Sequence, residues 1–442
     1  MSDLLVSLTR AVRFVRIAWV ALCVWMRVKS RRVWDRWLGR DPKSRDLSAI
    51  HQRNAEQIYA VAVKLRGLLI KICQVVGTRS DFFPPQYVRT LSKAHDSVPP
   101  RAFPEMRAVV EAELGKPLDS LFSEFSETPI AAASLAQVHR ARLLSGELVA
   151  VKIQYPDIDR IVRTDLSATK LICRIYERLD PQPVELLPLL EELNAHLGLE
   201  LDFRREVESA DRIRKLFEDD PAIRVPRMNH ELSTRRVIVM ELVSGIKVTD
   251  VDTLKAVGID RHGLITDLLR TYNRMILAYG FFQADPHPGN MFVNPRGNGD
   301  HEIILLDFGL SKELPKGFGL ALFELMFSMM TYNEASMIRA FEQLGFGTKT
   351  GDKSTYLEIA QRMIGTSTDG TFQGEFTEEM TDDLFEAIRE NPIVSVPVDF
   401  VLVARAFSLL SGIAHSLGVR ANVLDTMGPG GGSARPESAV LR

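Results

Sequence analysis

The chain has 442 residues, of which 25% are charged and 45% hydrophobic, and its formal net charge at pH 7 is −2. This length allows two lobes or domains with their own cores, and the near-neutral charge excludes a general electrostatic attraction to nucleic acid. The three cysteines, Cys23, Cys73 and Cys173, are too far apart for a disulfide framework or a zinc motif, which fits a reducing, cytoplasmic location.

The N-terminal segment, residues 1–45, is basic and amphipathic. Its apolar core, Ile17 to Met26, contains Trp19 and Trp25 and is about half as long as the roughly 20 residues that a bilayer-spanning helix needs. No small-residue cleavage site follows, which argues against a signal peptide. The pattern predicts a helix lying at an anionic membrane surface, or a short anchor in the inner membrane, with packing on the protein's own core as the alternative. The flanking basic residues are Arg10, Arg13, Arg16, Arg27, Lys29, Arg31 and Arg32.

The rest of the sequence alternates between helical and strand-rich parts. Residues 46–128 are expected to form a helical extension, which the proline pairs at 84–85 and 99–100 interrupt. Residues 129–242 carry short β-branched runs around a long helical region, and 137–143 and 148–154 predict a hairpin. Residues 243–427 are mainly helical apart from a second predicted hairpin, 291–293 with 303–306, and residues 428–442 read as a disordered tail. A strand-rich part followed by a mainly helical part predicts an α+β fold with two lobes. No segment after the N-terminus is long and apolar enough to be expected to span a membrane.

Lys152 is the first candidate for chemistry. Val149-Ala150-Val151-Lys152 ends a predicted strand, and this order places an ammonium group against the α- and β-phosphates of ATP in protein kinases. Alone the match is weak, because a lysine at the end of a strand is usually solvated. Met240 and Glu241, at the end of a later strand, are also expected to contact the nucleotide.

An alanine-rich run precedes Lys152, where a kinase would carry its glycine-rich loop. Glycines let backbone N–H groups approach phosphates closely and flex, whereas alanines allow the approach with less freedom. We therefore expect a stiffer phosphate-facing loop, with the start of a helix as the alternative. Its candidate nucleotide-binding residues are Ala131, Ala132, Ala133 and Ser134.

The run Ala284-Asp285-Pro286-His287-Pro288-Gly289-Asn290 predicts a rigid loop. Its Asp-x₄-Asn spacing matches the kinase catalytic loop, in which the aspartate orients the acceptor and the asparagine binds metal. Further along, Asp307-Phe308-Gly309 follows an apolar strand and places another carboxylate at its tip. Oxygen donors from Asn290 and Asp307 suit Mg²⁺, which also takes phosphate oxygens.

Glu206 is the predicted ion-pair partner of Lys152. It lies on a predicted helix that also carries Glu200 and Asp202. Residues two apart diverge on a helix, and Glu206 lies on another side again, so the three acids are expected to serve separate purposes.

At this point the sequence resembles the UbiB family of atypical kinase-like proteins, which includes the kinase-like ATPases of ubiquinone biosynthesis. The resemblance covers about residues 55–417. Its motifs are the Ala-rich loop, Glu200-x-Asp202, the run at 284–290, and an extension bearing Lys71-Ile72-Cys73-Gln74, Thr78-Arg79-Ser80-Asp81 and Val98-Pro99-Pro100. It implies a bilobal protein-kinase-like fold whose helical extension covers the place where a protein substrate would dock. It also implies that Lys71 and Gln74 face the nucleotide pocket, that Glu200 contacts Lys71, and that Lys152 pairs with Glu206.

Three residues depart from the family pattern. Cys73 stands in place of a glycine, Gln283 in place of a histidine and Ser209 in place of an asparagine. None of these changes removes a predicted metal or phosphate ligand, so they bear on the extension and on turnover.

The resemblance implies ATP and Mg²⁺ as cofactors. It further implies ATP hydrolysis or phosphotransfer to a small or lipid-like acceptor, in quinone or isoprenoid-lipid metabolism at a membrane. A nucleotide-gated lipid-binding or chaperone module with little turnover is one alternative, and a small-molecule phosphotransferase is another, although the Lys71–Gln74 extension argues against the latter. A conventional protein kinase is disfavoured because no Ala-Pro-Glu follows Asp307 and residues 310–315 are expected to lead straight into a helix.

Overall fold

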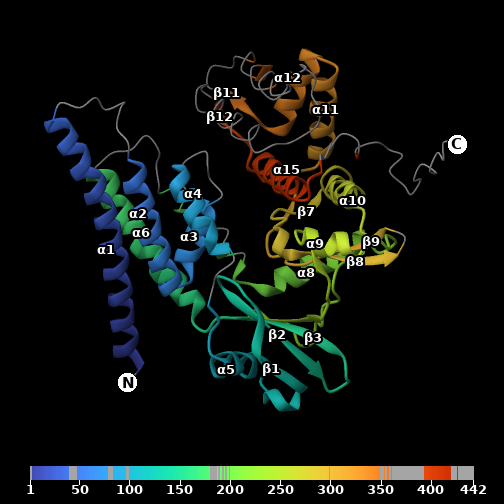
Figure 1. Cartoon of the computed structure of the whole chain (residues 1–442), viewed down its shortest axis with the longest axis horizontal. Helices are drawn as coiled ribbons and strands as arrows, with labels where there is room; N and C mark the ends of the chain where they lie inside the picture. The colour runs from blue at the N-terminus through green and yellow to red at the C-terminus, as the bar shows by residue number, and fades with distance from the viewer. Residues whose placement is uncertain are drawn as a thin grey trace. The chain divides into compact units, whose positions relative to one another are not determined.

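The computed structural model describes residues 2–38, 47–77, 83–95, 99–179, 200–297, 299–348 and 393–419, with isolated positions between 187 and 198, between 353 and 360, and at 426. The chain forms two compact units (Figure 1). The N-terminal unit comprises Met1–Arg205 and Met228–Leu242, and the C-terminal unit comprises Glu206–Arg227 and Val243–Arg442. The expected disordered tail and the Thr78–Asp81 run lie outside the described residues. The expected domain boundaries remain a prediction.

A group of helices opens the N-terminal unit. They are α1 (Ser2–Trp37), α2 (Ser48–Leu65), α3 (Leu68–Gly77), α4 (Pro85–Leu91), the 3₁₀ turn η2 (Ser92–His95) and α5 (Phe103–Leu114). Prolines in the first turn begin α4 and α5, where a missing N–H costs little. α1 packs against α2 and against the later helix α6 (Ile158–Leu179), around Ile17, Leu65 and Ala168. The three helices lie side by side in Figure 1.

An antiparallel sheet in the order β1-β2-β3-β5 completes the N-terminal unit. After the 3₁₀ turn η3 (Leu118–Ser120), its strands are β1 (Phe122–Ala132), β2 (Ala136–Leu143), β3 (Leu148–Gln154) and β5 (Val237–Glu241). Val149, Val151 and Ile153 alternate along β3 and point into the core, as a half-buried strand requires. Met106 of α5 and Val162 of α6 belong to the same core.

The C-terminal unit is built around a second sheet, in the order β4-β9-β8-β6. Its strands are β4 (Ile223–Arg224), β6 (Ile246–Lys247), β8 (Met291–Gly297) and β9 (Asp300–Leu305). The surrounding elements are α8 (Phe203–Leu216, in this unit from Glu206), α9 (Val251–Ala256), α10 (Arg261–Asn273) and the π-helical turn η4 (Arg274–Tyr279). A short ribbon pairs β7 (Phe281–Gln283) with β10 (Ser311–Glu313), and the 3₁₀ turn η5 (Pro288–Asn290) leads into β8. The ends of β7, η5 and β9 therefore hold the candidate catalytic residues.

The last described elements are mainly helical. They are α11 (Phe318–Met330), α12 (Glu334–Leu344), β11 (Gly347–Thr348), β12 (Ile393–Ser395) and α15 (Val398–Ser416). α11 lies so close to η4 at Gly319 that an added Cβ there would be 2.5 Å from the Leu277 carbonyl oxygen, which leaves no room for a side chain. α15 packs against α10 and, among the described residues, is the helix long and apolar enough to cross a membrane. The expectation that no later segment meets that test is wrong by length and composition, and 44% of the apolar window of α15 is buried inside the protein.

Three sequence expectations about local structure need correction. Strands begin at Phe122 rather than near residue 129. The sequence did not indicate this start, because β1 is a largely exposed strand with irregular register and little hydrophobic alternation. Leu201 and Asp202 are not helical and α8 begins at Phe203, so Glu200 and Glu206 do not share one helix. The residues after Asp307 form β10 before the next helix begins.

Candidate functional site

Asp307 lies directly beyond β9 with a φ of +60°, a conformation that non-glycine residues rarely adopt. Its Oδ1 accepts a hydrogen bond from the Gly309 backbone N–H at 3.2 Å. The Asn290 Nδ2 lies 3.5 Å from Asp307 Oδ2, and the Leu306 N–H donates to the Asn290 carbonyl at 2.9 Å. The β8–β9 hairpin thus brings together the two predicted metal ligands.

The donor set at this point fits Mg²⁺. Within the described part of the chain, no group of three or more His, Cys, Asp or Glu side chains could hold a metal by itself. One carboxylate and one amide oxygen suit Mg²⁺, because this ion usually keeps several waters and takes further ligands from substrate phosphates.

Gln283, which departs from the family's histidine, binds the backbone carbonyls on both sides of the Asp307 Cα atom. Its Nε2 donates to the Leu306 carbonyl at 2.9 Å and also to the Asp307 carbonyl. Its Oε1 accepts from the Tyr272 hydroxyl at 2.6 Å. Burial, and then the charge of Asp285, raise the pKa of Tyr272, so this hydroxyl remains a donor. Sequence reasoning noticed Gln283 but not this role.

Asp285 sits in a loop that its own backbone rigidifies. The His287 N–H donates to the Asp285 carbonyl at 2.7 Å, and the Asn290 N–H donates to the His287 carbonyl at 2.9 Å. The Asp285 carboxylate pairs with Arg405 of α15, with Nη2 3.1 Å from Oδ1. Sequence analysis missed Arg405, although a signal existed, since it is the lone Lys or Arg in the apolar stretch 398–416.

Glu206 is almost buried, with 7% of its surface exposed. A Cβ added at Gly309 would lie 3.5 Å from Glu206 Oε2 and 3.3 Å from Asp307 Oδ1. Gly309 therefore lies beside both carboxylates, and only the distance to Asp307 is shorter than an ordinary van der Waals contact of a Cβ. Lys152 belongs to the other unit, and its pairing with Glu206 stays a prediction.

Lys152 lies in the middle of the N-terminal sheet, paired with Val138 on β2 and Ile238 on β5. Its Nζ is 5.2 Å from the centre of the Phe203 ring, within the range of a cation–π contact. Met240 and Glu241 pair with Ala150 and Val149 at the end of the same ladder.

The alanine-rich run is a tight turn between strands and not the start of a helix. Ala131 and Ala132 are still in β1, and the Ala133 N–H donates to the Ala136 carbonyl at 2.8 Å. The Tyr155 hydroxyl donates to the Ala133 carbonyl at 3.1 Å, and the Tyr155 N–H donates to the Leu135 carbonyl at 2.9 Å. Ser134 is buried. These hydrogen bonds tether the turn to Tyr155, and its expected stiffness stays a prediction.

Lys71 of the helical extension makes the ion pair with Glu200 that the resemblance implies. Lys71 Nζ lies 2.5 Å from Glu200 Oε1, and the two side chains are 19% and 14% exposed. Gln74 Nε2 donates to the Ala94 carbonyl at 3.1 Å. Cys73 is fully buried, and burial raises the pKa of its thiol to about 12, so it stays protonated.

Asp202 has a different partner from Glu200. Its carboxylate accepts hydrogen bonds from Arg204 Nε at 2.9 Å and Nη2 at 2.8 Å, and these bonds hold its pKa below the ordinary value. Glu200 and Asp202 therefore contact different groups, although the helical spacing on which that expectation rested is absent, because α8 begins only at Phe203.

The structure has three features of a kinase-like protein: a lysine on a central strand, a rigid Asp-x₄-Asn loop, and an Asp-Phe-Gly directly after a strand. The family model of the ABC1 atypical kinase-like domain matches residues 93–341. AarF domain-containing protein kinase 1 of Xenopus laevis is 33% identical over 387 residues, which cover 85% of this chain and 73% of that protein. The chain therefore belongs to the ABC1 atypical kinase-like family, also known as the UbiB family, which confirms the resemblance.

Other relatives extend the comparison. An uncharacterised protein of Synechocystis is 33% identical over 83% of this chain, and the chloroplastic Activity of BC1 Complex Kinase 7 of Arabidopsis thaliana is 34% identical over 80%. The chain spans 62% and 51% of the lengths of these two relatives. The solved complex of Rv3197 with erythromycin from Mycobacterium tuberculosis has a TM-score of 0.59 at 23% identity, covering 86% of this chain and 97% of that one. The kinase-like α+β fold is thereby confirmed.

Proposed function

We propose that this protein is an ATP- and Mg²⁺-dependent atypical kinase or ATPase. The observation that carries the proposal is the approach of Asn290 to Asp307 at 3.5 Å, with Asp285 in the same rigid loop. Membership of an atypical kinase-like family supports it.

Each candidate residue has a role in this proposal. Asn290 and Asp307 would hold Mg²⁺, which when bound neutralises charge on the phosphates. Lys152, steadied by Glu206, would bind the α- and β-phosphates, and Asp285 would orient the attacking hydroxyl or water. Most of the rate enhancement would come from positioning and electrostatic stabilisation, because phosphoryl transfer needs little covalent help from the protein. Further nucleotide contacts would come from residues 131–134, Met240, Glu241, Lys71, Gln74, Glu200 and Asp202.

The acceptor in this proposal is small or lipid-like, in quinone or isoprenoid-lipid metabolism. The resemblance implies an extension that covers the docking place of a protein substrate, and the Lys71–Glu200 pair that it also implies is present within the N-terminal unit. The tethered alanine turn supports the alternative of a nucleotide-gated lipid-binding module, since a stiff loop favours tight binding over rapid exchange. Tight ATP binding without hydrolysis would favour that module.

Asp307→Asn tests the proposed chemistry. The change keeps the shape of the side chain but removes the charge that would bind Mg²⁺, so Mg²⁺-dependent ATP hydrolysis should fall by about 100-fold or more. Hydrolysis is measured as phosphate release with and without Mg²⁺. Undiminished metal-dependent hydrolysis by this variant would end the proposal.

We also propose that α1 lies along an anionic membrane surface without spanning it. One face of α1 is occupied within the N-terminal unit, where Arg13 pairs with Asp165 and Arg27 Nη1 donates to Asn54 Oδ1 at 2.9 Å. The other face is apolar and unusually exposed, with each side chain between 42% and 62% exposed. Its residues recur every three or four positions and are Val12, Val15, Trp19, Leu22 and Met26.

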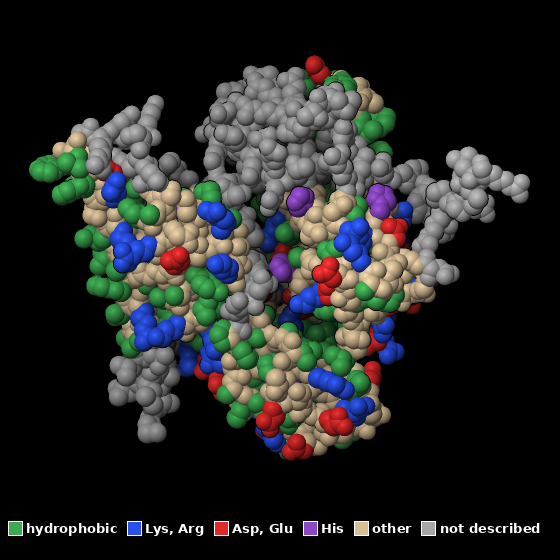
Figure 2. Space-filling view, in the orientation of Figure 1, with side chains coloured by type: hydrophobic (Ala, Val, Ile, Leu, Met, Phe, Trp, Pro, Cys, Tyr) green, Lys and Arg blue, Asp and Glu red, His purple; other side chains and the backbone are tan. Residues whose placement is uncertain are grey.

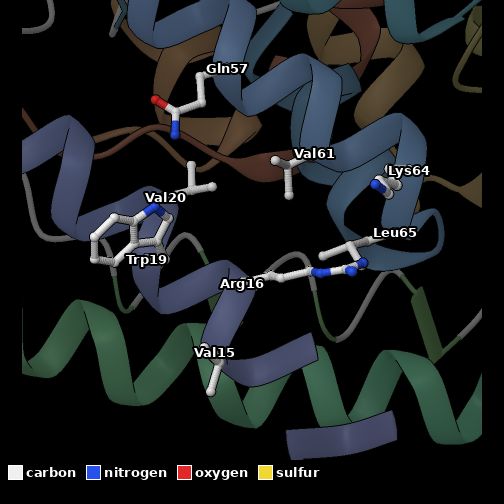
Figure 3. A pocket seen from close by; sticks show the side chains of 8 residues that line it. All are labelled: Val15, Arg16, Trp19, Val20, Gln57, Val61, Lys64 and Leu65. Atoms are coloured by element: carbon white, nitrogen blue, oxygen red, sulfur yellow. The ribbon is translucent and has the colours of Figure 1, made fainter. Parts of the chain in front are cut away.

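Charge on and beside α1 fits an anionic surface. The sequence from Leu4 to Trp34 contains basic residues and no acidic one. α1 and α2 also form a groove of about 370 Å³, with Val15, Trp19 and Val61 on its walls and Arg16 and Lys64 beside them (Figure 3). Figure 2 shows hydrophobic side chains gathered with Lys and Arg over this part of the molecule. Apolar walls next to cations match an acyl chain with a phosphate headgroup.

Vesicle flotation tests the membrane contact. The triple variant Trp19→Gln, Leu22→Gln, Met26→Gln should lose binding to phosphatidylglycerol-containing vesicles by about 10-fold or more, because it removes most of the apolar stripe. The matched control is Phe323→Gln, Phe327→Gln on α11, where two exposed rings stack at 6.4 Å. Equal flotation of the wild type and the α1 variant, or an equal loss in the control, would contradict a contact through α1.

A further inference from the structure

Arg405 is a charged residue in the middle of an apolar helix. No other Lys or Arg occurs in α15, whose Phe400, Ala406 and Phe407 are buried in the C-terminal unit. A half-buried guanidinium is costly unless a charged partner offsets its lost hydration. The partner is the carboxylate of Asp285, 3.1 Å away and 120 residues distant in the chain.

The ion pair with Arg405 restrains the side-chain torsions of Asp285. Pro286 and the hydrogen bonds of the 285–290 loop fix the backbone, but they leave the side-chain torsions of Asp285 unrestrained. The Arg405 Nη2 binds Oδ1, and no described hydrogen bond engages Oδ2. One oxygen is therefore held while the other can accept a hydrogen bond from an attacking hydroxyl or water.

We propose that Arg405 is a positioning residue that orients the Asp285 carboxylate toward the nucleophile, an inference that rests on the proposed function. In that reaction the acceptor oxygen bonds to the γ-phosphorus, and the bond from the γ-phosphorus to the β,γ-bridging oxygen breaks. ADP leaves, and the acceptor's proton passes to Asp285 Oδ2. In this proposal Arg405 acts through Asp285 and not on the nucleotide or the acceptor, so its loss affects turnover and leaves nucleotide affinity unchanged.

α15 offers a matched control for a purely structural role. Its Asp399 Oδ1 lies 3.0 Å from Lys312 Nζ on β10, and this second ion pair also attaches α15 to the body of the unit. Neither residue belongs to the proposed chemistry. If Arg405 only anchored α15, removing either ion pair would have similar consequences.

The experiment measures kcat and KM for ATP hydrolysis, ATP·Mg²⁺ affinity by calorimetry, and Tm for the full-length chain. Arg405→Gln should lower kcat about 10- to 100-fold, with KM and affinity within about 2-fold of wild type, as expected for a misoriented catalytic group. Arg405→Lys should recover part of kcat, and Asp399→Asn should leave it within about 2-fold. Arg405→Gln should add no loss in an Asp285→Asn background, because both changes remove the same oriented carboxylate.

The contrary outcomes are distinct. Wild-type kcat in Arg405→Gln, an equal loss of kcat in Asp399→Asn, or a further loss on top of Asp285→Asn would overturn the positioning role while leaving the proposed function intact. A wild-type protein that binds ATP·Mg²⁺ but never hydrolyses it would instead defeat the proposed function, and the positioning role with it.

Discussion

Asp307 adopts a backbone conformation that costs a non-glycine residue on the order of 1–3 kcal/mol, so the surrounding residues must hold it in place. Gln283 does so through two carbonyls, and the Tyr272 hydroxyl in turn fixes the Gln283 amide. The orientation of a proposed metal ligand therefore depends on a buried amide. A side chain with one donor and no acceptor could not satisfy all three groups.

Gln283→Leu should lower the free energy of unfolding by about 2–4 kcal/mol, because it leaves buried polar groups unpaired. It should also weaken ATP·Mg²⁺ binding, since Asp307 is no longer held. Urea denaturation measures the free energy of unfolding, and calorimetry measures the ATP·Mg²⁺ affinity. Gln154→Leu is the control, because it removes a similarly buried amide that belongs to the N-terminal unit and makes no hydrogen bond to Asp307; its Nε2 donates to the Leu201 carbonyl at 3.0 Å. Unchanged affinity in Gln283→Leu would contradict this account.

The candidate site residues could be predicted from the sequence where they belong to a short motif of neighbouring residues. Asp285, Asn290 and Asp307 stand out in the sequence because the motifs that carry them are local. Arg405 and Tyr272 could not be found in that way, because each acts on a residue that only folding brings close. Nothing in the structure explains Ser209 in place of the family's asparagine.

At the scale of elements, two buried side chains on β2 connect the strand to the segment before α5. Gln137 Oε1 accepts from the Arg101 N–H at 2.8 Å, and its Nε2 lies 2.8 Å from His139 Nε2. His139 Nδ1 is 2.8 Å from the Ser126 carbonyl, so Nδ1 must donate and Nε2 must accept. Burial lowers the pKa of His139, with the Ser126 carbonyl opposing that shift.

This arrangement predicts a pH dependence. The unfolded chain protonates His139 near its ordinary pKa of about 6.5, whereas the folded protein does so at lower pH. Stability from this site is therefore present above about pH 6.5 and is lost as the pH falls through the lower, folded pKa. Urea denaturation between pH 7.5 and pH 5 should show a steeper loss in wild type than in His139→Phe, which cannot titrate. Equal slopes would refute the prediction.

Elements were predictable where hydrophobic periodicity is strong. The β2–β3 hairpin follows from alternating apolar residues around Ser145-Gly146. β1 gave no such signal, since most of its side chains are exposed and its register against β2 shifts repeatedly. The start of α8 at Phe203 was also missed, because no glycine or proline stands directly before it in the sequence. The structure shows that the Asp202 carboxylate, just before α8, accepts hydrogen bonds from the Arg204 N–H and Nε.

At the scale of the whole molecule, the proposed chemistry draws on both units. Lys152 and the Lys71–Glu200 pair belong to the N-terminal unit, and Asp285, Asn290 and Asp307 belong to the C-terminal unit. Family membership and the kinase-like fold follow from the sequence, because the motifs are spread in a fixed order along most of the chain. The central claim is that these separate groups act on one nucleotide.

A double-mutant cycle on ATP·Mg²⁺ affinity tests that claim most directly. Calorimetry on wild type, Lys152→Met, Asp307→Asn and the double variant should show each single change weakening binding by about 10-fold or more. The two losses should be non-additive, with a coupling of about 1 kcal/mol or more, because both residues engage the same metal-bound phosphates. Additive losses, or affinity that neither change alters, would contradict the account.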